Sequence, residues 1–170
     1  MKLIEAMKKC KDLARKADDI KAKIAQNSAH LSFETPTYGD KQRDQVREWL
    51  QSHEDIQKEI LRLRVAIQKT NMATTVAIEL GEKQVTKTIA EWIHRRRDLA
   101  KADMSAWANL SDKGLKEGVG KNSLGEALEV KIVRNFDPVE RDKKLELYRS
   151  EPSIVDATLE VVNATTDLIE

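Results

Sequence analysis

The sequence is poor in the residues that mark several protein classes. It has one cysteine in 170 residues, which excludes a disulfide-stabilised scaffold and favours a reducing compartment. Lysine plus arginine total 30 and aspartate plus glutamate 29, so the basic excess of a general nucleic-acid binder is missing. No apolar run approaches the ~18–20 residues of a membrane span, and the first residues lack the ~7–15-residue apolar stretch of a signal peptide. We therefore expect a cytoplasmic protein that does not enter a membrane.

What the sequence does have is helical periodicity. Between residues 40 and 76, apolar and small polar residues recur in alternating steps of three and four, which is the 3.5-residue period of a coiled-coil seam. Shorter stripes predict helices over residues 2–28, 87–110 and 137–170. The seam of the long helix consists of Val46, Trp49, His53, Ile56, Ile60, Leu63, Ile67, Thr70 and Thr74.

Two segments have the character of short strands. Residues 76–86, around Gly81, suggest a small hairpin, and the glycine-rich stretch 111–126 suggests a loop. Residues 127–136 alternate, with Leu128, Val130 and Ile132 on one face that we expect to be buried. A lone strand is unstable. Its partner is expected to be the 76–80 run, the 82–86 run or the same strand of a second chain.

These elements predict a mainly α fold, an elongated helical bundle with a coiled-coil-like long helix and a small β-hairpin or β-arm. One domain is expected over residues 1–170: a helical core at 1–110 with the long helix at about 40–76, the glycine-rich loop and β-arm at 111–136, and a C-terminal helix at 137–170. The Asp137-Pro138 pair should start that last helix, and Pro152 should kink or split it.

No motif for catalysis or metal binding is found. His30, His53 and His94 do not have the spacing of zinc ligands, and Cys10 lies on an apolar helix stripe without a catalytic partner pattern. The GVGKNS stretch at 118–123 lacks the spacing of a phosphate-binding P-loop. We therefore predict no catalytic residue, no metal and no cofactor, and a protein that is not an enzyme.

Candidate binding residues come from two patterns. The segments TNMATT (70–75) and VNATT (162–166) echo each other; their polar residues either cap helices, bond to a partner helix or line a polar pocket. In the run 95–97, three consecutive arginines cannot share one helix face, so at least one should point inward or toward a partner. Arginine beside tryptophan can hold a nucleotide-like anion. The candidate ligand-binding residues are Asn71, Thr74, Trp92, Arg96, Arg97, Asn163 and Thr166.

The order of several segments resembles the septicolysin-like family of small bacterial and phage proteins. The matching segments are MKLIEAMKKCKDL, IQKTNMATTV, VTKTIAEWIHRRRDLA, LEVKIVRNFD and IVDATLEVVNATTDLIE. Ala164 stands where that family usually has tryptophan. The resemblance implies a helical bundle with a small β element and a bacterial or phage setting, including a virion, but it implies no established activity.

Two functions from different classes remain open. The first is a non-enzymatic, homo-oligomeric interaction or structural protein, such as a phage-encoded accessory or virion component, with a protein partner. The second is a protein that binds or sequesters a small anionic ligand between helices or subunits. Residues 1–26 hold eight basic and four acidic residues, whereas residues 151–170 hold five acidic and no basic ones. We therefore expect the first and last helices to pack together, within one chain or between chains.

Overall fold

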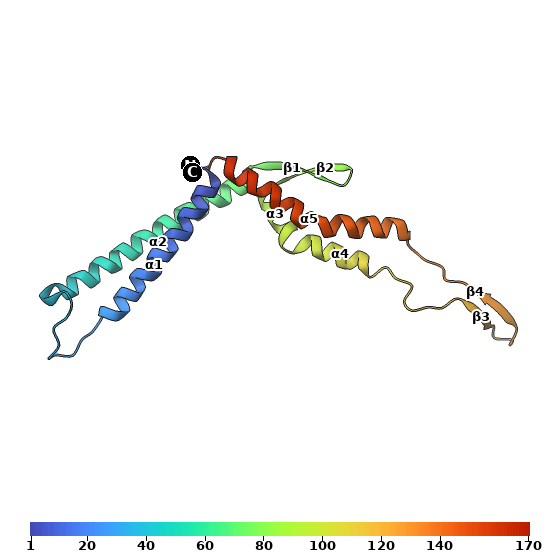
Figure 1. The fold of residues 1–170 in the computed structure, drawn as a ribbon, viewed down its shortest axis with the longest axis horizontal. Helices are drawn as coiled ribbons and strands as arrows, with labels where there is room; N and C mark the ends of the chain where they lie inside the picture. Colours follow the sequence, from blue (N-terminus) through green and yellow to red (C-terminus); the bar gives the residue numbers. More distant parts are fainter. The chain divides into compact units, whose positions relative to one another are not determined.

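The computed structural model describes all residues from 1 to 170 and is mainly α-helical, with two small antiparallel β-hairpins (Figure 1). This is the predicted fold class. The chain divides into two compact units. The first comprises residues 1–75, 88–90 and 159–170, and the second comprises residues 76–87 and 91–158. The sequence predicts one helical domain and gives no sign of this division.

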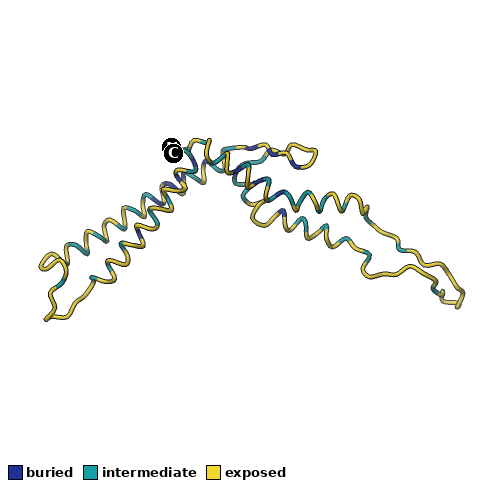
Figure 2. Tube along the Cα trace, in the orientation of Figure 1, coloured by how far each residue is buried: buried dark blue, intermediate teal, exposed yellow.

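The first unit is built on a helical hairpin. Helices α1 (Leu3–Asn27) and α2 (Gln42–Ala73) pack against each other, and a 3-10 turn at Gly39–Lys41 leads into α2. Every predicted seam position of α2 is buried or half-buried, which confirms the inward face read from the sequence. Full burial is concentrated toward one end of the hairpin, as Figure 2 shows. The buried residues of the pair are Leu3, Ala6, Ala17, Ile60, Leu63, Ala66 and Thr70.

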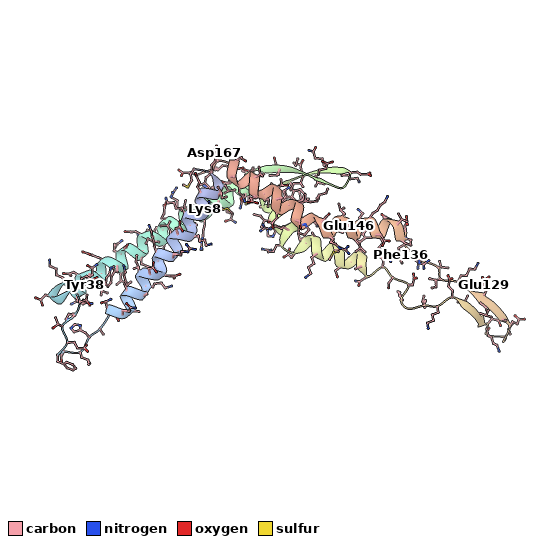
Figure 3. All side chains as sticks on the ribbon, in the orientation of Figure 1. Lys8, Tyr38, Glu129, Phe136, Glu146 and Asp167 are labelled. Carbon is pink, nitrogen blue, oxygen red and sulfur yellow. The ribbon has the colours of Figure 1, made fainter.

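The two ends of the chain meet in this unit. The backbone N–H of Leu3 donates to the carbonyl of Thr166 at 2.9 Å, and the N–H of Leu168 donates to the carbonyl of Met1 at 2.9 Å. Lys2 also forms an ion pair of 2.9 Å with Asp167, which is labelled in Figure 3. These bonds join the start of α1 to residues that follow the last helix. The predicted packing of the first helix along the last is not observed, because α1 packs against α2.

The second unit contains the predicted hairpin and the third helix. Strands β1 (Thr75–Leu80) and β2 (Lys83–Thr88) turn at Gly81, whose φ of +63° favours glycine. Alternate β1 residues are buried, beginning with Val76. The helix that follows consists of α3 (Ile89–His94), a π-helical segment (Arg95–Leu99) and α4 (Ala100–Ala108). The sequence predicts this helix but not its π-helical interruption.

The β-arm differs from its prediction in three respects. Strand β4 (Ala127–Val130) is shorter than expected, and its partner is β3 (Gly118–Lys121), which lies inside the segment predicted to be a loop. The predicted pairing with the 76–86 hairpin is therefore wrong. Leu128 and Val130 do share one face, but both are exposed rather than buried. The error arose because alternation fixes which residues share a face, whereas burial requires another element to cover that face.

Helix α5 (Pro138–Thr165) begins where the sequence predicts. The carboxylate of Asp137 accepts a hydrogen bond of 2.9 Å from the N–H of Val139 and caps the helix. The sequence predicts a kink or a split at Pro152, and the split does not occur, because the helix continues through this residue. The inner-face residues Glu151, Val155 and Leu159 are buried on both sides of the proline turn. Their packing offsets the lost backbone hydrogen bond.

We expect Leu63→Ala to lower the free energy of unfolding by about 3 kcal/mol, because this side chain is 0% exposed and its removal leaves a cavity in the α1–α2 seam. Leu61→Ala is the matched control on the same helix. Leu61 is 63% exposed, so its loss should cost less than about 0.5 kcal/mol. Urea unfolding at fixed protein concentration measures both, and equal losses would contradict the assigned inward face.

Candidate functional site

The structure separates the candidate ligand-binding residues into two groups. Asn71 and Thr74 at the end of α2 lie in the first unit, as do Asn163 and Thr166 near the end of α5. Trp92, Arg96 and Arg97 belong to the second unit. The residues therefore do not form one site within either unit.

The residues proposed to hold a nucleotide-like anion are engaged elsewhere. Trp92 is 0% exposed, and its indole N–H donates to the carbonyl of Val76 at 2.9 Å, so neither ring face is open for stacking. Arg96 forms an ion pair with Asp156. Arg97 pairs with its neighbour Asp98 at 3.2 Å. The stacking role predicted for Trp92 is therefore wrong, because the indole is a core side chain of the second unit.

The two asparagines of the repeated TN and VN segments have a feature in common. The side-chain oxygens of Asn71 and Asn163 are buried and accept no hydrogen bond. Thr74 and Thr166 instead act through their backbones: the carbonyl of Thr74 accepts from Ile89, and that of Thr166 accepts from Leu3. Buried acceptors without donors are uncommon in folded proteins. The asparagine oxygens could accept hydrogen bonds from a donor, but not from an anion.

The inward-pointing arginine predicted for the run 95–97 is Arg95, which the candidate set omitted. Its guanidinium makes two hydrogen bonds of 2.7 Å to the carboxylate of Glu151 and one of 2.6 Å to Asp103. Glu151 is only 2% exposed, and the guanidinium lies over the ring of Tyr148, 5.8 Å from its centroid. The sequence signal for Arg95 was the arginine run itself, because helix geometry requires that at least one of three consecutive arginines point inward or toward a partner.

The partners of Arg95 also affect titration. The hydrogen bonds that Arg95 donates to Glu151, and then the one that it donates to Asp103, raise the pKa of its guanidinium above its ordinary value. Burial, reinforced by the negative charge of Asp103, raises the pKa of the Tyr148 hydroxyl. The cluster thus keeps Arg95 charged and Tyr148 neutral. It also places an ion pair, in which Arg95 bonds to two carboxylates, where α5 packs in the second unit. This arrangement stabilises packing and leaves no free guanidinium for a ligand.

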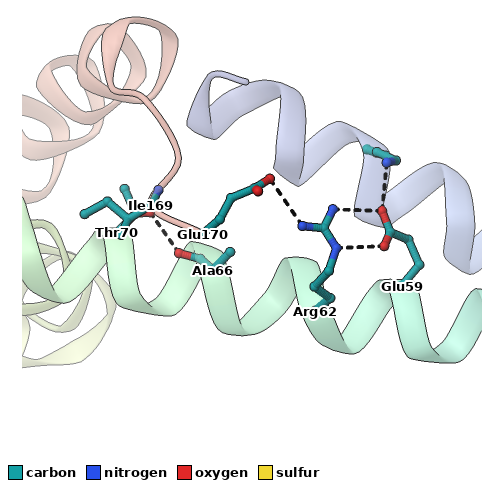
Figure 4. A network of polar contacts seen from close by, with 7 residues as sticks. Glu59, Arg62, Ala66, Thr70, Ile169 and Glu170 are labelled. Carbon is teal, nitrogen blue, oxygen red and sulfur yellow. Dashed lines mark hydrogen bonds and ion pairs between the residues drawn. The ribbon is translucent and has the colours of Figure 1, made fainter.

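A second polar network holds the C-terminal segment in the first unit (Figure 4). The hydroxyl of Thr70 donates to the carbonyl of Ala66 and accepts from the N–H of Ile169 at 2.9 Å. Nearby, Arg62 bonds to both Glu59 and Glu170. The hydrogen bonds from Arg62, and then that from Lys9, lower the pKa of Glu59 from 4.5 to about 2.

The larger hollows do not coincide with the candidate residues. One of about 840 Å³ lies at the tip of the α1–α2 hairpin, a second of about 500 Å³ lies beside Leu13 and Ile56, and a smaller one of about 240 Å³ lies at the base of the β-arm. No group of three or more histidine, cysteine, aspartate and glutamate side chains is placed to hold a metal ion. None of the helices has the length and apolar character needed to cross a lipid bilayer.

The β-arm exposes an unusual amount of apolar surface. Leu128 and Val130 are about two-fifths exposed on one face, and Val119 is 84% exposed on the other. Glu129, which is labelled in Figure 3, lies between Leu128 and Val130 on β4. No third strand pairs with the hairpin. A two-stranded hairpin with both faces uncovered is marginally stable by itself, so this surface is a candidate interaction site.

Residues 10–168 match the model of a family of unknown function, DUF6847. The chain belongs to this family. It also resembles a solved structure, that of a functionally unknown conserved protein from Corynebacterium diphtheriae, with a TM-score of 0.57 and 20% identity over 99% of both chains. That likeness shows the fold alone. No curated protein matches the chain. The resemblance to septicolysin-like proteins stays a prediction.

We expect Glu151→Gln to lower the free energy of unfolding by about 3 kcal/mol, because it leaves the part-buried charge of Arg95 without its main partner. Glu146→Gln, also on α5, removes an exposed 3.5 Å ion pair with Arg149 and should cost less than about 0.5 kcal/mol. The apolar double variant Arg95→Met/Glu151→Leu should regain much of the loss. Urea unfolding of the three variants tests this, and equal effects of the two single changes would rule out the assigned role.

The pKa of Glu59 provides a test in acid. Because folding lowers this pKa, the stabilising contribution is present above pH 4.5 and is lost as the pH falls toward about 2. Arg62→Met removes the largest cause, so the pKa of Glu59 should rise toward 4.5, and the stability lost in acid should be smaller and should end at a higher pH. Carboxyl ¹³C shifts report the titration directly, and an unchanged midpoint in the variant would contradict this assignment.

Proposed function

We propose that this chain is a non-enzymatic protein that self-associates and serves as an interaction or structural component. The observation that carries the proposal is its accessible surface of 12378 Å². A compact monomer of this mass exposes about 8,500 Å², and two separate compact units of half the mass would together expose only about 10,200 Å². The chain therefore exposes surface well beyond what a compact fold of its size requires.

The location of the apolar surface supports the same function. The outer face of α2 carries Leu61, Val65 and Met72, all exposed and spaced to share one side of the helix. The β-arm adds Val119 and Leu124, each more than four-fifths exposed. Apolar surface gathered on protruding elements is typical of interaction sites rather than of a monomer's solvated surface.

The charged clusters also fit a structural role better than catalysis. Arg95 donates hydrogen bonds to both Glu151 and Asp103, and Arg96 forms an ion pair with Asp156. A catalytic acid, base or nucleophile must have a lone pair or a proton directed toward its substrate. These groups instead make their hydrogen bonds to other residues of the chain. We place the protein in a reducing cytoplasm or a virion, as its single cysteine and the septicolysin-like resemblance suggest.

A second candidate function rests on Asn71 and Asn163. Their buried, unpartnered oxygens favour a ligand that donates N–H or O–H groups. This changes the chemistry of the ligand proposed from the sequence, because an anion supplies acceptors rather than donors. Such a ligand would bind in the first unit, near the ends of α2 and α5.

Native mass spectrometry of the freshly purified full chain tests both functions. We expect a dimer or a higher closed oligomer whose mass is a whole multiple of the 19.3 kDa chain. An additional small mass that is lost on denaturation would support the ligand function. A bare monomer at every protein concentration would contradict self-association.

A further inference from the structure

We propose that two copies of this chain pair edge to edge through β4, forming one antiparallel four-stranded sheet centred on Val130. This inference rests on the proposed self-association and specifies its surface. The occupant of the free β4 edge is a second copy of the same strand, and the argument comes from the register of the arm and from its sequence.

The outer edge of β4 is unpaired. The N–H of Asn122 bonds to the carbonyl of Glu126, which closes the hairpin with a hydrogen-bonded pair. Hydrogen-bonded and non-hydrogen-bonded pairs alternate in an antiparallel ladder, so Leu128 and Val130 direct their backbone groups toward β3. Ala127 and Glu129 direct theirs outward, and Lys131 continues this alternation beyond the strand. The N–H of Ile132 bonds to the Glu117 carboxylate at 3.1 Å, on the β3 side, as the alternation requires.

The sequence around Val130 is complementary to itself when reversed. An antiparallel pair of β4 strands with Val130 opposite Val130 places Glu129 opposite Lys131 and Leu128 opposite Ile132. Each match occurs twice because the pairing is two-fold symmetric. Glu129 and Lys131 are the residues with outward backbone groups, so they would form the hydrogen-bonded pairs.

The neighbouring registers are worse. Only the odd-numbered residues of this segment direct their backbone N–H and C=O groups away from β3. The two registers next to the one centred on Val130 are therefore centred on Glu129, which places Glu129 opposite Glu129, or on Lys131, which places Lys131 opposite Lys131. Both registers bring like charges together, which is destabilising in a sheet. The register centred on Val130 is therefore selected by charge as well as by backbone geometry.

Pairing also removes the weakness of the isolated arm. Leu128, Val130 and Ile132 of both copies would form one apolar row on one face of the sheet, and the exposed β4 edge would disappear. Three or more strands are generally needed for independent stability.

A cysteine at the two-fold axis tests the geometry. In the full chain carrying Cys10→Ser, Val130→Cys places two thiols in a non-hydrogen-bonded pair, where Cα atoms lie about 4.5 Å apart, within disulfide range. Mild oxidation should convert most of this variant into a covalent dimer. The control Val119→Cys is more exposed but lies on β3, and it should cross-link at least tenfold more slowly.

A charge exchange tests the register. Glu129→Lys would place lysines opposite each other twice, so we expect the dimer dissociation constant to rise about tenfold. The exchanged variant Glu129→Lys/Lys131→Glu restores both opposite-charge pairs and should return within about twofold of the unaltered chain. Sedimentation velocity over a range of concentrations measures all three proteins.

The outcomes separate this inference from the proposed function. An oligomeric chain whose Val130→Cys variant does not cross-link, or whose Glu129→Lys variant assembles unchanged, would overturn the β4 pairing and leave self-association standing. A chain that is monomeric at every concentration would overturn both. Rapid cross-linking together with loss and recovery of assembly in the charge variants would support the pairing.

Discussion

Two packed helices can bury only one stripe of each, and this constraint governs most of the molecule. In the α1–α2 hairpin, residues such as Leu63 and Ala66 are buried, whereas seam positions such as Val46 and Ile56 are half-buried. The apolar outer face of α2 has no intrachain cover. A chain organised in this way gains a modest core and exposes a large surface, which is the basis of our proposal that it assembles with further copies.

Polar contacts fix the packing of both units, each of which has only a small apolar core. The Arg95–Glu151 pair lies inside the second unit, and the bonds from Thr70 to Ile169 and from Arg62 to Glu170 hold the C-terminal segment in the first. Directional contacts of this kind fix which surfaces meet, while their net contribution to stability is small once desolvation is counted. The π-helical segment begins at Arg95, so the local change in helix geometry coincides with this ion pair.

Periodicity revealed the elements of this fold better than their partners. The seam of α2, the turn at Gly81 and the Asp137 cap were predictable because each depends on residues close in sequence. The partner of β4 was missed because glycine-rich strands such as β3 carry little strand signal. Trp92 lies on the apolar stripe of the predicted third helix and also beside arginines, so the sequence allowed both a core role and a ligand role. The structure shows the core role. Arg95 was predictable only as one of three, since helix geometry requires an inward arginine without selecting it.

Backbone hydrogen exchange of the β-arm at increasing protein concentration tests the central claim most directly. If two β4 strands pair around Val130, the amides of Glu129 and Lys131 become bonded, and their exchange slows as the chain assembles. The amides of Leu128 and Val130, directed toward β3, should depend much less on concentration. Exchange of Glu129 and Lys131 at the rate of a free edge in the assembled protein would contradict the account.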